Sequence, residues 1–169
     1  MKPTSGRVKL FGHDITGMAP EQISQLGLVR SFQRTSIFSA CTVAENILTA
    51  LHLKGECGVL HALLRTQKFR REEADLKSQA NDLLAFLGLG ARAHTLASNL
   101  SYGEQRLLGV GLALAAKPKV LLLDEPAAGL NPSETEAFKE MVRRIGQSGV
   151  TVLLVEHDMH MVMSISDHI

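Results

Sequence analysis

Two adjacent acidic residues end a short apolar stretch, and their types and position suggest chemistry. Asp124 and Glu125 follow four aliphatic residues at 120–123, a pattern typical of a buried strand. At the carboxyl end of a parallel strand, an aspartate can hold Mg²⁺ beside the phosphates of a nucleotide. The next carboxylate can orient or deprotonate an attacking water. A strand that simply ends in a solvated turn could also be followed by two acidic residues. The pair alone therefore does not decide between a catalytic site and a solvent-exposed turn.

His157 occupies a similar place after a second stretch of this kind. Residues 150–155 are predicted to form a strand, which Glu156 and His157 follow directly. Because polar groups at the carboxyl ends of parallel strands face the ligand crevice, we expect His157 to lie at the same edge as the two acids. Gln33 directly follows a further, shorter strand candidate at 28–32.

A Ser-Tyr-Gly-Glu-Gln segment at 101–105 opens a predicted helix. Ser101 and Glu104 fit a capping box, and this local role alone explains both residues. The same helix start also offers free backbone N–H groups and the positive end of the helix dipole to an anion. The Ser101 hydroxyl, and Gly103 with no side chain, would let a phosphate group come close.

Hydrophobic patterning predicts the elements that hold these residues. The strands at 120–123 and 150–155 flank an amphipathic helix, which we expect to begin at a capping box of Ser133 and Glu136 and to end at Gly146. Its apolar stripe comprises Phe138, Met141, Val142 and Ile145. Strands that are apolar on both faces belong to a parallel sheet covered on both sides. The C-terminal half is therefore predicted to be α/β.

The stretch from 42 to 99 shows only helical signals. A capping box at Thr42 predicts a helix to about Leu53. A second helix carries an apolar face formed by Leu76, Ala80, Leu83, Leu84 and Leu87. We expect a helical lobe at 42–99, inserted between α/β parts at 1–41 and 100–169.

Composition narrows the function classes. The 169 residues include 18 Lys and Arg against 17 Asp and Glu, and the net charge of +1 gives no electrostatic argument for binding nucleic acid. The length suggests one domain, or one domain with a lobe. Every apolar stretch is shorter than the ~20 residues that a membrane-spanning helix needs.

Taken together and in this order, the segments resemble the ATP-binding subunit of an ABC transporter. Gln33 falls at the Q-loop glutamine of that family, residues 100–105 match its signature motif, and residues 120–125 match Walker B with the catalytic glutamate. Residues 128–132 match the D-loop, and His157 matches the switch histidine. The resemblance implies an α/β fold of the P-loop NTPase type, with a parallel-sheet core and an inserted α-helical lobe.

Within this family, the sequence is most similar to the ATPases of branched-chain amino acid importers. Residues 28–33, 42–46, 127–132 and 155–159 carry that similarity, and Asn131 in the D-loop favours one of the two ATPase subunits of the subgroup. Urea and short-amide importers use closely related ATPases, so that substrate class stays open.

The resemblance also implies a mechanism in which two such domains sandwich two ATP molecules. Asp124 and Gln33 would hold Mg²⁺, Glu125 would polarise the attacking water, and His157 would contact the γ-phosphate side. The implied nucleotide-binding residues are Gln33, Ser101, Gly103, Glu104, Gln105 and Asn131. The implied partners are a second ATPase subunit, integral membrane permease subunits and, indirectly, a solute-binding protein. The implied location is peripheral, on the cytoplasmic side of the plasma membrane.

The sequence departs from the family pattern in two ways. Tyr102 stands where many members have glycine, and Glu104 precedes Gln105 where many have glutamine alone; we expect both changes to be tolerated. No G-x-x-x-x-G-K-[ST] segment occurs in these residues, and the nearest match, at 12–17, lacks the lysine and the hydroxyl that follow. By family order, Walker A belongs before residue 1, so we expect an ABC ATPase that lacks both ends.

Two other functions remain as hypotheses. A truncated, noncatalytic ABC-like interaction protein would keep the permease-facing lobe and bind no ATP alone. The absence of Walker A favours it, whereas the presence of Asp124, Glu125 and His157 favours an active parent enzyme. A soluble ABC ATPase of DNA repair is disfavoured by the neutral charge and by a compact lobe without a coiled-coil or zinc insertion.

Overall fold

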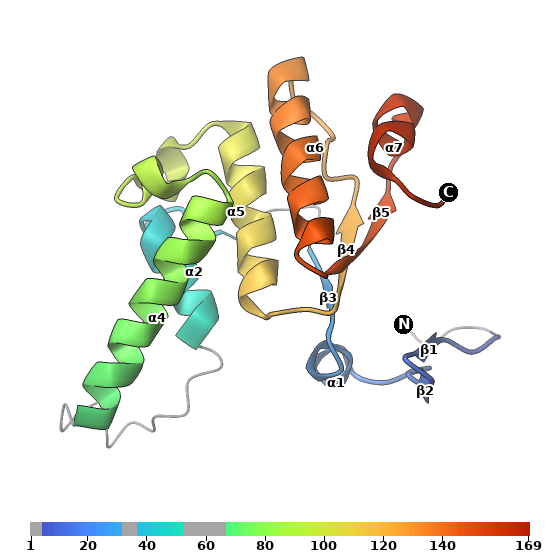
Figure 1. The fold of residues 1–169 in the computed structure, drawn as a ribbon, viewed down its shortest axis with the longest axis horizontal. Helices are drawn as coiled ribbons and strands as arrows, with labels where there is room; N and C mark the ends of the chain where they lie inside the picture. Colours follow the sequence, from blue (N-terminus) through green and yellow to red (C-terminus); the bar gives the residue numbers. More distant parts are fainter. Residues whose placement is uncertain (1–4, 32–36, 53–66) are drawn as a thin grey trace.

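A three-stranded parallel sheet forms the framework of the structure, a computed structural model that describes residues 5–31, 37–52 and 67–169. The strands are β3 (Leu28–Arg30), β4 (Val120–Asp124) and β5 (Thr151–Val155), in the order β3–β4–β5 (Figure 1). Because the strands are parallel, their carboxyl ends lie at one edge of the sheet, as the sequence predicted. Gln33 lies outside the described residues.

Two helices connect the sheet to the rest of the core. Helices α5 (Tyr102–Ala115) and α6 (Pro132–Gln147) contact each other, and α6 packs against β5. Leu121 and Leu123 of the central strand are fully buried. The apolar stripe predicted on α6 is confirmed, because its members are all buried: Phe138, Met141, Val142 and Ile145. This packing fixes the strand end that carries Asp124.

The predicted start and end of α6 are wrong by a few residues. Asn131, not Ser133, is the N-cap, because the Asn131 side chain accepts a hydrogen bond from the Glu134 N–H and Pro132 suits the first helical position. Gly146 lies inside the helix, which continues to Gln147. The chain turns at Gly149, whose φ of 91° is favourable only for glycine.

Full burial of β5 is also wrong for the described residues. The burial of β5 alternates, and Leu153 and Val155 are 53% and 47% exposed. The next helix, α7 (Met159–Ile165), buries only one of its three methionines: Met161 is 2% exposed, whereas Met159 and Met163 are exposed. One face of β5 and one face of α7 are therefore apolar and uncovered in the described part of the chain.

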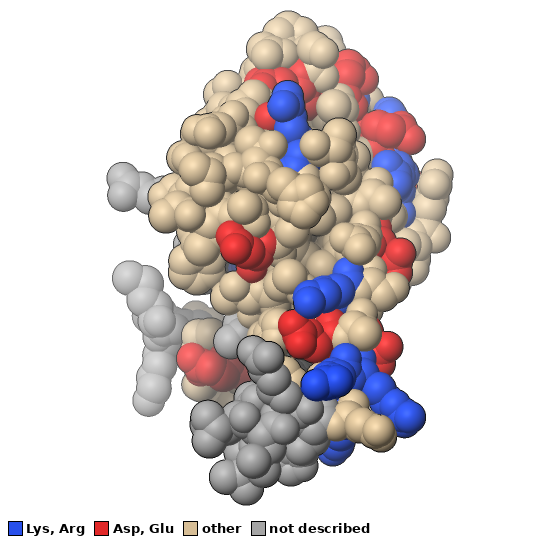
Figure 2. Space-filling model, turned by 90° about the vertical axis from the view of Figure 1, so that its left-hand side faces the viewer, with Lys and Arg blue, Asp and Glu red and all other residues tan. Residues whose placement is uncertain are grey.

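The described elements between residues 42 and 99 are helical. They are α2 (Val43–His52), α4 (Gln67–Phe86) and the 3₁₀ turns η1 (Gly90–Arg92) and η2 (Ala97–Asn99). Helix α2 packs against α4 and α5, and α5 contacts α6, so α5 and α6 link this region to the sheet (Figure 1). Figure 2 views this end of the molecule, where acidic and basic side chains lie interspersed along one side. On α4, the exposed side chains of Glu73 and Lys77 form an ion pair one helical turn apart.

The N-terminal part is a small hairpin followed by a short helix. Strands β1 (Lys9–Leu10) and β2 (His13–Asp14) pair antiparallel, and α1 (Pro20–Gln25) precedes β3. Among the helices of the described residues, none has the length and apolar character needed to cross a membrane.

Candidate functional site

The acidic edge of the sheet brings three of the predicted residues together. Asp124 ends β4 in register with Val155 of β5. The Glu125 N–H donates to the Val155 carbonyl at 2.8 Å, and Glu125 has a φ of 45°, in the left-handed region. Glu125 Oε1 lies 2.8 Å from His157 Nε2. The structure therefore places the acid pair and the histidine at one edge, as the sequence predicted.

Arg30 is a member of this edge that sequence reasoning missed. Its Nη2 donates to Asp124 Oδ2 at 2.5 Å, although the two residues are 94 positions apart in the chain. Parallel pairing sets Arg30 opposite Leu122, so its side chain is within reach of the end of β4. The arginine neutralises the carboxylate that was predicted to hold a metal ion.

Glu156 is a second residue whose role the sequence did not reveal. Its Oε1 accepts a hydrogen bond from the Ala127 N–H at 2.8 Å, and its Oε2 accepts one from the His157 N–H at 3.2 Å. The carboxylate thus ties the turn after β4 to the turn after β5. The only signal in the sequence is its position directly before His157.

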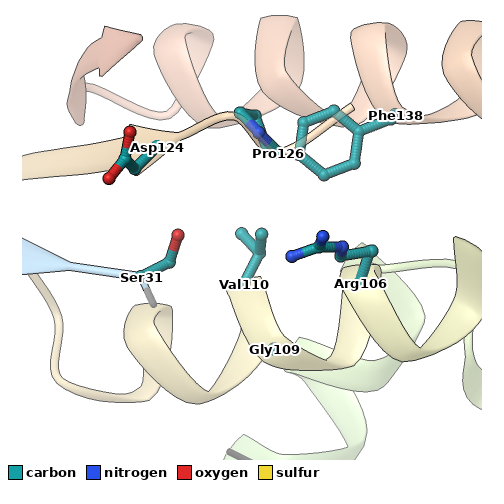
Figure 3. A pocket seen from close by; sticks show the side chains of 7 residues that line it. All are labelled: Ser31, Arg106, Gly109, Val110, Asp124, Pro126 and Phe138. Carbon is teal, nitrogen blue, oxygen red and sulfur yellow. The ribbon is translucent and has the colours of Figure 1, made fainter. Parts of the chain in front are cut away.

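A small pocket lies behind this edge, between β4 and α5. Figure 3 shows Asp124, Pro126 and Phe138 on one side of it and Ser31, Val110 and Arg106 on the other. The pocket measures about 20 Å³, enough for roughly one water molecule. This pocket is therefore too small for a nucleotide.

The start of α5 carries the capping box that the sequence predicted. Ser101 Oγ accepts a hydrogen bond from the Glu104 N–H at 3.2 Å, and Glu104 Oε2 accepts one from the Ser101 N–H at 2.9 Å. The other Glu104 oxygen pairs with Arg92 at 3.0 Å. Gln105 donates its side-chain amide to the Leu100 carbonyl at 3.1 Å. Both side chains therefore support the local structure, and their contacts with a nucleotide stay predictions.

Glu134, on another helix, completes this second cluster. Its Oε1 accepts hydrogen bonds from Ser101 Oγ at 3.2 Å and from the Gly103 N–H at 3.1 Å. Its Oε2 accepts one from the Asn131 N–H at 3.1 Å. The hydrogen bond from Asn131, with those from Gly103 and Ser101, holds the pKa of Glu134 below its ordinary value, while burial opposes the shift.

Close packing at the two helix starts requires glycine. A Cβ added at Gly103 would lie 2.7 Å from the carboxyl carbon of Glu134. A Cβ at Gly129, where φ is 82°, would lie 3.2 Å from the Tyr102 ring. The Tyr102 hydroxyl accepts a hydrogen bond from Arg106 Nη2 at 2.5 Å. Tyr102 therefore joins the start of α5 to the loop that leads into α6.

These two clusters suit the two charged parts of a magnesium–nucleotide complex. Asp124 offers the hard carboxylate oxygens that Mg²⁺ prefers, and its side chain is 26% exposed. The donors at Ser101 and Gly103 already bind one anion, the Glu134 carboxylate. The residues present therefore fit both groups.

The fold and the two clusters define an α/β protein with carboxylates at the carboxyl edge of a parallel sheet and with anion-accepting donors at a helix start. The family model for the ABC transporter matches residues 1–128, and the chain belongs to this family.

Several curated relatives are described as branched-chain amino acid transport ATP-binding proteins. The chain is 41% identical over 169 residues to the high-affinity branched-chain amino acid transport ATP-binding protein LivG of Escherichia coli K12. It is equally similar to BraF of Pseudomonas aeruginosa, which carries the same description. In both cases the match covers 99% of this chain and 66% of the relative. The chain thus spans just under two thirds of these relatives.

Solved structures agree on the fold. The ADP conformation of MJ1267, an ATP-binding cassette of an ABC transporter, superposes with a TM-score of 0.81 at 32% identity, covering 99% of this chain and 65% of that one. The ATP-binding cassette MJ0796, bound to ADP and Pi in a dimeric post-hydrolysis state, matches with a TM-score of 0.72 at 21% identity. The second likeness concerns the fold alone.

Proposed function

We propose that the chain forms most of the ATP-binding and ATP-hydrolysing subunit of an ABC importer for branched-chain amino acids. The observation that carries this proposal is the contact of Glu125 with His157, beside Asp124 at the exposed sheet edge. The descriptions of LivG and BraF support the substrate class.

At the sheet edge, each residue has a distinct part in hydrolysis. Asp124 and Gln33 would hold the Mg²⁺ that accompanies ATP, and Asp124 would then give up its ion pair with Arg30. Mg²⁺ neutralises the charge that develops on the phosphates. Glu125 orients and deprotonates the attacking water, and His157 steadies Glu125 and faces the γ-phosphate. Glu156 holds the two turns that carry these side chains in register.

The second cluster serves the nucleotide held by a partner subunit. Ser101 and Gly103 donate to its phosphates from the start of α5, where the helix dipole also favours an anion. Asn131 approaches from the D-loop, and Glu104 and Gln105 complete the signature segment. The two subunits close when ATP is bound between them, and hydrolysis opens them.

The remaining partners follow from the same proposal. A helical lobe at 42–99 contacts integral membrane permease subunits, and the parts at 1–41 and 100–169 form the ATPase core. A solute-binding protein delivers the amino acid to the permease on the other side. The subunit works at the cytoplasmic side of the plasma membrane as a peripheral protein, without nucleic acid.

The test is transport by a completed cassette, defined as E. coli LivG in which this chain replaces the matched residues. Expressed in cells that lack LivG, the completed cassette is expected to restore uptake of labelled leucine, and its Glu125→Gln variant is not. Uptake of urea in place of leucine, with the urea permease present, would favour the related amide importers. Loss of uptake by a folded cassette that still assembles with the permease would contradict the proposal.

A further inference from the structure

The start of α5 is already occupied by an anion from the same chain. Ser101 Oγ and the Gly103 N–H both donate to one oxygen of Glu134, at 3.2 and 3.1 Å. Glu134 approaches so closely that no Cβ fits at Gly103 without moving the carboxylate. The contact is therefore a tight fit between two helix starts 31 residues apart.

This arrangement leaves a phosphate group without its donors. A serine hydroxyl and a backbone N–H each have one proton to donate, and both protons are directed to Glu134. Two anions at hydrogen-bond distance from the same donors would also repel each other. A phosphate and the Glu134 carboxylate therefore cannot occupy this place together.

We propose that Glu134 is a positioning residue whose carboxylate fills the phosphate-facing donors of Ser101 and Gly103 until ATP is sandwiched, and then releases them. This inference rests on the proposed function and adds a step to it. Binding of the partner's nucleotide must displace Glu134, so the carboxylate raises the ATP concentration that closes the dimer. The lowered pKa of Glu134 keeps the carboxylate charged for this competition.

Release of Glu134 also reaches the catalytic edge. The other carboxylate oxygen binds the Asn131 N–H at 3.1 Å, at the end of the D-loop. Within that loop, the Leu130 N–H donates to the Ala127 carbonyl, and the Ala128 N–H donates to the Glu125 carbonyl. These hydrogen bonds, together with the backbone at Leu130, connect Glu134 to the residue proposed as the general base through one short loop.

The test uses Glu134→Gln in the completed cassette, with Glu125→Gln present in every form to prevent hydrolysis. Glutamine is also favourable at this capping-box position, so the change removes the charge and keeps the shape. We expect the ATP concentration for half-maximal dimer formation, measured by light scattering, to fall about two- to fivefold, the size of one helix-terminus charge effect. Damage to the helix start would raise that concentration instead.

The matched control is Glu136→Gln on the same helix. Glu136 pairs with Lys139 and is 68% exposed, and we expect its loss to leave dimer formation unchanged. If Glu134→Gln shows no thermal unfolding transition, and so is not folded, Glu134→Asp is used in its place. The shorter aspartate cannot reach both the start of α5 and the Asn131 N–H. It should therefore also lower the ATP concentration needed for dimer formation.

The outcomes separate the two proposals. An ATP requirement that is unchanged or higher in the folded Glu134 variant overturns the inference and leaves the proposed function intact. A reference form that never dimerises with ATP overturns the proposed function and this inference with it.

Discussion

Three acidic side chains at the candidate site have partners from distant parts of the chain. Asp124 pairs with Arg30, Glu125 contacts His157, and Glu134 binds Ser101. Spacing predicted Asp124, Glu125 and Ser101, because strand ends and capping boxes are local patterns. It did not predict Arg30 or Glu134, because those contacts depend on which strands and helices become neighbours. Gln33 stays a prediction, since it lies outside the described residues.

Two glutamates near helix starts, Glu45 and Glu134, have lowered pKa values, so we expect the folded protein to lose stability in acid. Hydrogen bonds from the Thr42 N–H and hydroxyl lower the pKa of Glu45, and the Asn131 N–H is the main cause of the lowered pKa of Glu134. Both groups therefore stabilise the fold above the ordinary glutamate pKa, about 4.5, and this stability is lost as the pH falls through their lowered values.

We expect the free energy of unfolding of the completed cassette to fall below about pH 4.5, where these glutamates begin to bind protons. Urea unfolding at a series of pH values measures the effect. In Glu45→Gln the decline should be shallower, because one group that binds a proton on unfolding is gone. An identical decline in the variant would show that Glu45 does not contribute.

At the scale of the elements, the pattern of apolar and polar residues predicted the sheet and most of the helices. The residues at which helices begin and end, and the faces of strands that stay exposed, were less predictable. The stripe on α6 is buried, yet its N-cap is Asn131 and not Ser133, because an asparagine followed by proline competes for the same role. The outer face of β5 is exposed, although its sequence is that of a strand covered on both sides. The apolar sequence of a strand does not determine whether another element packs on each of its faces.

Helix α5 packs closely against residues of the helical region at 42–99, and this close packing predicts the effect of adding a methyl group at Gly111. A Cβ at Gly111 would lie 2.4 Å from Leu87 Cδ1 and 3.0 Å from Ile47 Cδ1, both in the core. Gly111→Ala should therefore reduce the free energy of unfolding by about 1–3 kcal/mol, as expected for overpacking. Urea unfolding of the completed cassette measures it.

Gly146→Ala is the matched control for this packing prediction. Gly146 also lies within a helix, and an added Cβ there meets no atom within 4 Å. This change should stabilise by about 0.5–1 kcal/mol through helix propensity. If Gly111→Ala behaved like Gly146→Ala, the close approach of α5 to Leu87 would be wrong.

At the scale of the whole molecule, the proposed function needs phosphate-binding groups that these 169 residues do not contain. The 169 residues contain no Walker A sequence, which would supply the backbone N–H groups and the lysine that hold the β- and γ-phosphates. The side chains of Leu153, Val155 and Met159, on β5 and at the start of α7, are exposed. Under the proposed function, the phosphate cradle is therefore expected to come from residues other than these 169.

We therefore expect these 169 residues alone to bind Mg-ATP only weakly, and the completed cassette to bind it with micromolar affinity. Asp124 without a phosphate cradle presents a carboxylate to a polyanion, which disfavours binding. Calorimetric titration of both proteins measures the difference. Micromolar binding by the 169 residues would contradict this division of the site and would also exclude the noncatalytic alternative.

The central claim is that Glu125, oriented by His157, is the general base for ATP hydrolysis. The most direct test compares ATP turnover and Mg-ATP affinity in the completed cassette and its Glu125→Gln variant. Loss of a positioned base should lower the turnover rate by about 10²–10⁴-fold, while the affinity stays unchanged because the phosphate contacts do not involve Glu125. Turnover by the folded variant at the rate of the parent would contradict the account.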